Sequence, residues 1–362
     1  MKRSLILIGM ELKYLLRQKF LWILVLVGIA LSVFQAPRSR IDLDYSIYAD
    51  YNKNHSTEGM SERDQFGIAY WQEKQERIKE NRNRLYERAL AEKQALTEQS
   101  GFRWEYVTAV EKAYSQEINL EIQEYTGWEW FFLVKSDMSP HNTGLFLIIL
   151  VAAAGLLLMT KDKENHTLFW SSFTGRGAGF SSYLLKIAAV LLYGLCVHIF
   201  FTGLYILLLA CMGGLDMHHW INAIQNLDQY GLCDLHLNIL GTCVLDMVLK
   251  CMASILVMFI VLLLTCVIRR YIFLFLAGLC VNGIFYYFLC GTVERRSYSI
   301  SYRMNPFSIL KLDKVLTYDA VNIFNHAVDV RLLFLVLWAC ILFGLLLLTY
   351  RVWRRFLYAN ES

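Results

Sequence analysis

Two charged residues lie inside an apolar run long enough to cross a bilayer, and they are the first candidates for chemistry. Asp246 and Lys250 are four residues apart, so a helix places them on one face within reach of an ion pair. His198 and Asn282 are polar residues near the middle of two other apolar runs. Charge at membrane depth often marks an ion, proton or substrate path, whereas helix–helix hydrogen bonding is the default role of a single polar side chain. We therefore treat these four residues as a candidate translocation path, and expect Asp246 and Lys250 to form a structural pair directed toward the outer interface.

The sequence carries no motif of a nucleotide-binding or hydrolytic enzyme. It has no GxxxxGK[ST], HExxH or GxSxG pattern, and residues 174–179 lack the Lys-Ser/Thr ending of a phosphate-binding loop. Asp216, His218 and His219 have no fourth ligand at the regular spacing of a metal site. A membrane enzyme based on His198 would lack a second catalytic group. We therefore expect no catalytic residue, no metal and no cofactor in this chain, so that ATP-driven work would require a separate subunit that binds ATP and magnesium.

The composition is that of a membrane domain interrupted by one water-soluble insert. Of the 362 residues, 56% are hydrophobic and 18% are charged. Residues 37–141 hold 14 Lys and Arg against 19 Asp and Glu, a net −5, which leaves 21 basic and 12 acidic residues, a net +9, elsewhere in the chain. This distribution excludes a disordered chain and an ordinary soluble enzyme. We expect no nucleic-acid partner.

The apolar runs predict an all-α integral membrane protein, since about 20 mostly apolar residues cross a bilayer. An amphipathic helix over residues 1–19 lies in the inner membrane interface and precedes the first span. Six spans are predicted, at residues 20–36, 142–160, 182–212, 243–268, 271–291 and 332–350. Lys and Arg in short loops place the N-terminus, the loop 161–181 and the tail 351–362 in the cytoplasm.

Three segments remain for the outer side: residues 37–141, 213–242 and 292–331. Several basic residues of the last segment, Arg331 among them, go against the rule that positive charge stays inside. In the first segment, residues 61–100 are typical of one long charged helix, which Gly101 ends, and residues 104–125 predict a second, antiparallel helix. Aromatic residues around Trp128 are expected at the outer membrane interface. We interpret this helical domain either as a solvated stalk or as a vestibule that handles a substrate.

The loop 161–181 carries the most informative motif. An acidic start is followed by a Thr-Leu pair, a later arginine and a lysine at the next span, namely Glu164, Thr167, Leu168, Arg176 and Lys186. This order resembles the cytoplasmic coupling segment of ABC-2 type permeases, which commonly has an acidic start, Gly-Thr-Leu, Pro-x-Ser-Arg and a lysine at the next span. His166 stands where that family has glycine, and Thr174-Gly175 replaces the turn that contains proline.

The layout is also similar to that family. It shares the interfacial helix, the six spans, the large insert between the first two spans, and an Asn-Pro pair, here Asn305-Pro306, before the last span. The resemblance implies a permease subunit of an ABC exporter in a bacterial-type plasma membrane, surrounded by lipid and dimeric with an identical or homologous second permease. It also implies two copies of a cytoplasmic ABC ATPase, whose closure on ATP is transmitted through the five residues of the loop motif.

The sequence leaves alternatives open for the cargo and for the class of function. Among ABC-2 permeases, the large first insert is most similar to the sodium-efflux, antibiotic-peptide and drug-efflux branches. Spans rich in Met and aromatic residues favour an amphipathic peptide, an antimicrobial or a drug-like compound, and sodium or another monovalent cation is the second candidate. The alternative from another class is a membrane sensor or assembly factor that uses residues 37–141 as a receptor and transports nothing.

Overall fold

The computed structural model shows a mainly helical chain. It describes residues 2–34, 63–115, 120, 127–129, 131–132, 143–164, 180–211, 215, 217–264 and 312–358. Within these residues, three helices are long and apolar enough to cross a membrane, namely Phe180–Cys211, Ile239–Leu264 and Val330–Arg354. A bent pair, Ser4–Arg17 and Lys19–Phe34, adds a fourth candidate if it counts as one span. The chain is therefore a helical membrane protein, as predicted, and the number of six spans stays a prediction.

Helices occupy the segments that were predicted to span, wherever the structure describes them. Helix Lys19–Phe34 covers the first segment, and α6 (Thr143–Glu164), α8 (Phe180–Cys211), α9 (Ile239–Leu264) and α13 (Val330–Tyr358) cover the second, third, fourth and sixth. The apolar part of α6, Phe146–Met159, is shorter than a typical span. The predicted fifth span, residues 271–291, lies outside the described residues.

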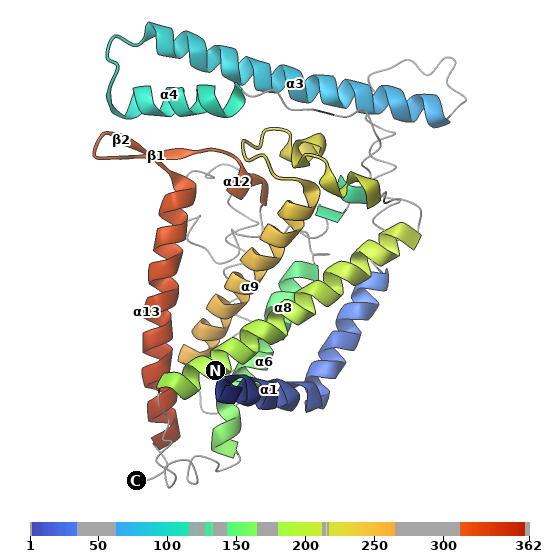
Figure 1. Cartoon of the computed structure of the whole chain (residues 1–362), viewed down its shortest axis with the longest axis vertical. Helices are drawn as coiled ribbons and strands as arrows, with labels where there is room; N and C mark the ends of the chain where they lie inside the picture. Colours follow the sequence, from blue (N-terminus) through green and yellow to red (C-terminus); the bar gives the residue numbers. More distant parts are fainter. Residues whose placement is uncertain are drawn as a thin grey trace.

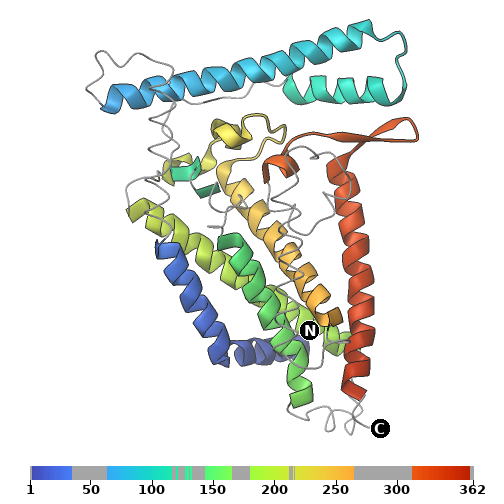
Figure 2. The ribbon, with the colours of Figure 1, turned by 180° about the vertical axis from the view of Figure 1, so that it is seen from behind.

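The described helices run between two ends of the molecule. The helices α3 (Arg63–Ala95) and α4 (Gly101–Tyr114) form a layer across one end, here called the α3 end (Figures 1 and 2). At the opposite end, called the α1 end, α1 (Lys2–Arg17) lies beside the place where α6, α9 and α13 finish and α8 begins (Figures 1 and 2). Thus α6, α9 and α13 run toward the α1 end, whereas α8 runs in the opposite direction (Figures 1 and 2).

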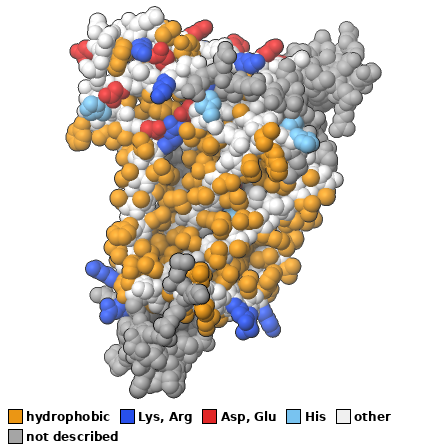
Figure 3. All heavy atoms as spheres, in the orientation of Figure 1, with side chains coloured by type: hydrophobic (Ala, Val, Ile, Leu, Met, Phe, Trp, Pro, Cys, Tyr) orange, Lys and Arg blue, Asp and Glu red, His pale blue; other side chains and the backbone are white. Residues whose placement is uncertain are grey.

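An apolar belt separates the two ends. On the face seen in Figure 3, hydrophobic side chains cover the middle of the molecule, while acidic and basic side chains gather together at the α3 end. Lys and Arg side chains mark the α1 end on the same face (Figure 3). Many of the apolar side chains of α8 and α13 are exposed, for example Ile199, Leu332 and Phe343. Lipid is the medium in which such surfaces are stable.

The amphipathic helix α1 turns sharply into the next helix. The two helices are bent by 67° at Gln18. Trp22 Nε1 donates a hydrogen bond of 2.6 Å to the Leu16 carbonyl across the bend. Leu15 is buried against the other helices, whereas Leu5, Ile6 and Met10 are exposed. The helix therefore covers the bundle with one apolar face and leaves a second apolar face at the surface, as expected for a helix in a membrane interface.

Small residues let the helices of the bundle approach closely. A Cβ atom added to Gly155 of α6 would lie 2.1 Å from the Met258 sulfur of α9, and one added to Gly28 would lie 2.7 Å from the Phe146 ring. Close contact through glycine is the usual mode of helix packing in membranes. The two positions therefore fix how near α6 comes to α9 and to the first apolar helix.

The helical insert is antiparallel, as predicted, and differs from the prediction at its end. Gly101 takes φ +85°, a value that favours glycine, and α4 begins there. Lys93 pairs with Glu111 between the two helices. However, α4 ends at Tyr114, earlier than the predicted residue 125.

The aromatic residues after the insert are not at the lipid surface. Trp128, Phe131 and Phe132 are buried and pack edge to face in sequence, and Phe132 continues onto Tyr230 at 5.5 Å. The predicted aromatic cluster is therefore present, but its rings face the inside of the protein, and its depth in the membrane stays a prediction. Aromatic rings provide large apolar surfaces, and here these surfaces pack against one another inside the protein.

A short β-hairpin precedes α13 and was not predicted. Strands β1 (Ala320–Ile323) and β2 (His326–Asp329) pair antiparallel, with Ala320 opposite Asp329 and Ile323 opposite His326. The short helix α12 (Leu312–Leu316) comes before the hairpin. Because β2 ends at the residue before Val330, the strand continues directly into α13.

Candidate functional site

A buried lysine ties three helices together at the α1 end. Lys186 of α8 is 2% exposed, and its Nζ lies 3.4 Å from Glu11 Oε1 of α1 and 3.3 Å from the Leu158 carbonyl of α6. A buried ammonium group needs such partners because its desolvation is costly. The contact thus joins the amphipathic helix to both helices that flank the loop 165–179.

At the α1 end, α13 contacts α6 and α8 through aromatic and hydroxyl side chains. Trp353 Nε1 of α13 donates to the Met159 carbonyl of α6 at 3.2 Å. Tyr183 Oη of α8 lies 2.6 Å from Thr349 Oγ1 of α13. The Tyr183 and Trp353 rings are also in contact, with centroids 5.4 Å apart. We call Glu11, Leu158, Lys186 and these four residues the α1-end cluster.

Two of the five predicted coupling residues have a place in the described structure. Lys186 is the centre of the α1-end cluster, and Glu164 is the last residue of α6. Thr167, Leu168 and Arg176 lie outside the described residues. In the sequence, the segment that contains them connects the end of α6 to the start of α8.

The predicted pair in α9 forms, and it is buried. Lys250 Nζ donates to Asp246 Oδ2 at 2.5 Å, and both side chains are 2% exposed. The two opposite charges are therefore paired inside the bundle, while their direction toward the outer interface stays a prediction. His198 of α8 is also buried, at 1% exposure, and α8 packs against α9. Asn282, the fourth residue of the candidate path, lies outside the described residues.

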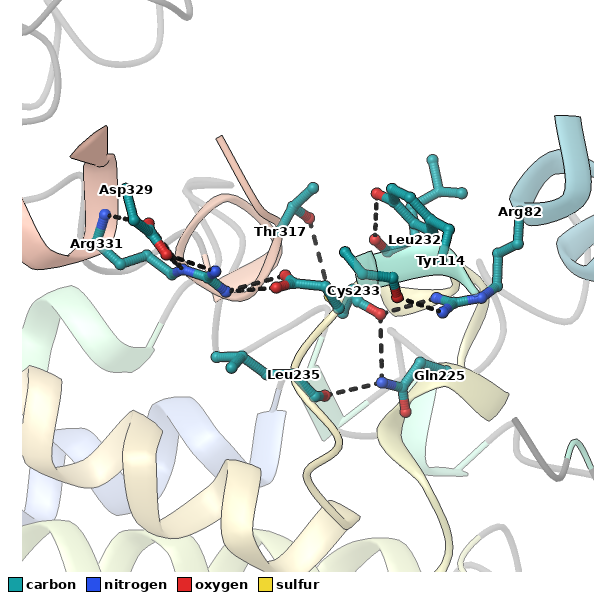
Figure 4. Close-up of polar contacts among 11 residues, drawn as sticks. Arg82, Tyr114, Gln225, Leu232, Cys233, Leu235, Thr317, Asp329 and Arg331 are labelled. Atoms are coloured by element: carbon teal, nitrogen blue, oxygen red, sulfur yellow. Dashed lines mark hydrogen bonds and ion pairs between the residues drawn. The ribbon is translucent and has the colours of Figure 1, made fainter. Parts of the chain in front are cut away.

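Another set of polar contacts lies at the α3 end, and Figure 4 shows its centre. Arg82 of α3 donates to the carbonyl oxygens of Cys233 at 2.9 Å and of Gly231 at 3.2 Å. Its guanidinium also lies over the Tyr114 ring of α4. Burial lowers the pKa of Arg82 from its ordinary value. The arginine thus holds both helices of the insert against the loop around residue 233.

Two further side chains fix this loop. Tyr114 Oη donates to the Leu232 carbonyl at 3.0 Å, and burial raises the pKa of the Tyr114 hydroxyl to about 12. From the other side, fully buried Gln225 donates to the carbonyls of Cys233 at 3.3 Å and Leu235 at 2.8 Å. Most of the contacts of the loop are therefore made through its backbone carbonyl groups (Figure 4).

Arg331 connects the same loop to α13. Its Nη1 lies 2.9 Å from both carboxylate oxygens of Asp234, and its Nη2 lies 2.7 Å from Asp329 Oδ2 (Figure 4). Contact of one guanidinium with both oxygens of a carboxylate is among the stronger polar interactions in proteins. Because Arg331 is the second residue of α13, its pair with Asp234 links the loop to the N-terminal end of that helix. We call the contacts of Arg82, Tyr114, Gln225, Asp234 and Arg331 the α3-end junction.

A separate contact joins α4 to the hairpin. Glu105 Oε2 accepts a hydrogen bond from the Ala327 backbone N–H at 2.8 Å, and Oε1 lies 2.9 Å from His326 Nδ1. The bond from Ala327, followed by that from His326, lowers the pKa of Glu105. Through this contact and Arg331, the insert and α13 are connected by polar groups.

Sequence reasoning identified the pair in α9 and Lys186, and it missed the α3-end junction. Arg82 lies in a helix with many similar charges, and no spacing distinguishes it from its neighbours. Arg331 appeared only as an exception to the charge rule, and its two carboxylate partners now explain its place. Asp329, two residues before Arg331, was the one local signal of this pairing.

The fold and these contacts define a class: a helical membrane protein with a polar cluster at each end and an ion pair inside the bundle. Comparison of the chain with models of protein families, with curated proteins and with solved structures found no match. Its residues and geometry therefore carry the functional argument. Among the described residues, no group of three or more His, Cys, Asp or Glu side chains is placed to hold a metal ion.

Proposed function

We propose that this chain is the permease subunit of an ATP-driven ABC exporter, with the α1 end in the cytoplasm and the α3 end outside. It would work as a dimer of permeases in the plasma membrane, bound to two cytoplasmic ATPase subunits through the segment 161–181. The cargo is an amphipathic peptide, an antimicrobial or a drug-like compound. The motif Glu164, Thr167, Leu168, Arg176 and Lys186 was the starting point for this proposal, and the geometry of the α1 end supports it.

The observation that carries the proposal is the contact of Lys186 with Glu11 and the Leu158 carbonyl. A segment that receives force from an ATPase must pass it to the spans through rigid contacts. Here the helices on both sides of the loop are joined by one buried ammonium group, and the same group holds the amphipathic helix. A displacement of the loop therefore moves α6, α8 and α1 as one unit.

The buried pair in α9 favours an amphipathic cargo over sodium. A path for a hydrated cation needs carboxylate or carbonyl oxygens that face the ion. Asp246 is instead neutralised by Lys250 at 2.5 Å, and both lie away from the surface.

The first experiment is purification of the tagged protein in mild detergent, followed by identification of the subunits that remain bound. We expect an ATPase with nucleotide-binding motifs to co-purify, and Glu164→Lys to abolish this binding. Glu80→Lys is the matched control, since Glu80 is an exposed carboxylate of α3 at the opposite end. ATPase binding that survives Glu164→Lys would place the docking surface elsewhere. Absence of any ATPase from the wild-type preparation would favour the sensor or assembly role.

A further inference from the structure

The tip of the β-hairpin carries a side chain that its own turn disfavours. The turn consists of Phe324 and Asn325, with φ values of +50° and +67°. Asparagine and glycine suit such positions, whereas a bulky residue with positive φ is an outlier. The Phe324 side chain is also 95% exposed. The tip thus combines an unfavourable backbone conformation with an exposed aromatic ring.

The hairpin is held firmly, so the ring has a defined position. The Asn325 N–H donates to Asn322 Oδ1 at 3.0 Å within the turn. Asn325 Oδ1 accepts a weaker bond from the Phe102 N–H of α4 at 3.4 Å. Next to the turn, the Ala327 N–H donates to Glu105 at 2.8 Å. These bonds fix the direction in which the tip points.

The position of the tip is set by α13. Figures 1 and 2 show the hairpin extending sideways from the top of this helix, beneath α4 and beyond the outline of the bundle. Directly below, α13 exposes Leu332, Leu335 and Val336, each more than half accessible. The apolar belt in Figure 3 ends at the level of the charged α3 end. The tip therefore overhangs the upper edge of the surface that faces lipid.

We infer that Phe324 is a membrane anchor whose ring inserts into the outer interface of the bilayer beside α13. Aromatic side chains are enriched at this depth of a membrane. Lipid is favoured as the partner because the exposed leucine and valine residues of α13 continue the same apolar surface downward. The ionic groups nearby do not oppose insertion, since His326 pairs with Glu105 and Arg331 pairs with Asp329. The anchor keeps the insert and the top of α13 at a fixed height relative to the membrane.

The inference depends on α13 as a membrane span and does not depend on the exporter function. Its test replaces Phe324 with the photoreactive analogue p-benzoylphenylalanine, in the full-length protein in phospholipid nanodiscs. The analogue keeps an aromatic ring at the tip. Arg84 of α3 receives the same analogue as the matched control, because it is exposed and lies in the layer farthest from the α1 end. Adducts are identified after irradiation by mass spectrometry of the peptides.

We expect position 324 to give phospholipid adducts at a yield several-fold above that of position 84. Cross-links of position 324 to a second copy of the chain, in place of lipid, would overturn the inference and assign the tip to a dimer interface. Equal lipid yields at both positions would overturn it as well. The variant Phe324→Asn supplies an independent readout, because it suits the turn better. In detergent, amide exchange at Ala327 should be as slow in Phe324→Asn as in the wild type. In nanodiscs, where only the wild type has the anchoring ring, amide exchange at Ala327 should be faster in Phe324→Asn than in the wild type.

Discussion

Replacing Lys250 with methionine should destabilise the protein severely, because it leaves the Asp246 carboxyl group buried without its partner. Methionine has a similar length and fills the same space. Both side chains of the pair are 2% exposed, so water does not replace the lost contact of 2.5 Å. Removing one partner of a buried ion pair costs about 3–5 kcal/mol. The double variant Asp246→Leu with Lys250→Met removes both charges, and we expect its free energy of unfolding to stay within about 1 kcal/mol of the wild type.

The assay is unfolding by SDS in mixed micelles, followed by circular dichroism for the wild type, both single variants and the double variant. Glu80 and Arg84 provide the control, since they form a pair at the same spacing of four residues but are 72% and 68% exposed. Arg84→Met should lower the free energy of unfolding by no more than about 0.5 kcal/mol. The contrast between the two pairs isolates the effect of burial.

A decrease of less than about 1 kcal/mol in the free energy of unfolding of Lys250→Met would refute the reasoning. It would show that water reaches Asp246, or that neighbouring side chains fill the space at little cost. Export by the double variant gives a second result. Full export would assign the pair to structure alone. A stable double variant that exports nothing would instead place Asp246 and Lys250 in the translocation path.

Three further predictions concern the two ends of the molecule. Arg331→Ala should lower the free energy of unfolding by about 2–3 kcal/mol, because Asp234 loses charge-assisted bonds, and limited proteolysis of the hairpin should become faster. The lowered pKa of Glu105 stabilises docking of the hairpin above the ordinary carboxyl pKa of 4.5, and this contribution should be lost as the pH falls through the lowered value. Amide exchange at Ala327, corrected for the intrinsic rate at each pH, should show this loss in the wild type and not in Glu105→Gln. Lys186→Met should leave the ATPase bound and hydrolysing ATP while export falls, and unchanged export would refute transmission through the α1-end cluster.

The sequence was sufficient for the helices and for contacts along a single helix. Long apolar runs determine where α8, α9 and α13 lie, because the bilayer requires them. The pair of Asp246 and Lys250 was predictable from a spacing of four residues in a helix. Its burial was not predictable, because the side of α9 that is covered depends on α6 and α8, which come from other parts of the chain.

The aromatic cluster and the hairpin show the same limit. Trp128 and Phe131 have the composition of an interfacial belt, and only the position of Tyr230, about 100 residues later, makes them a buried core. The hairpin turn contains Phe-Asn in place of the Asn-Gly that signals such turns. Bonds from α4 across more than 200 residues stabilise the hairpin, and no local pattern encodes them.

The separation in sequence of the α3-end contacts has a consequence for how the chain is made. Glu105 meets Ala327 across 222 positions, and Arg82 meets Cys233 across 151. Synthesis runs from the N-terminus, so the insert is made long before the segment that secures it. Until the hairpin emerges, the binding face of α4 stays uncovered. Docking of the insert therefore requires the C-terminal part of the chain, and in a chain truncated before the hairpin the insert would stay undocked and be cleaved more readily by proteases.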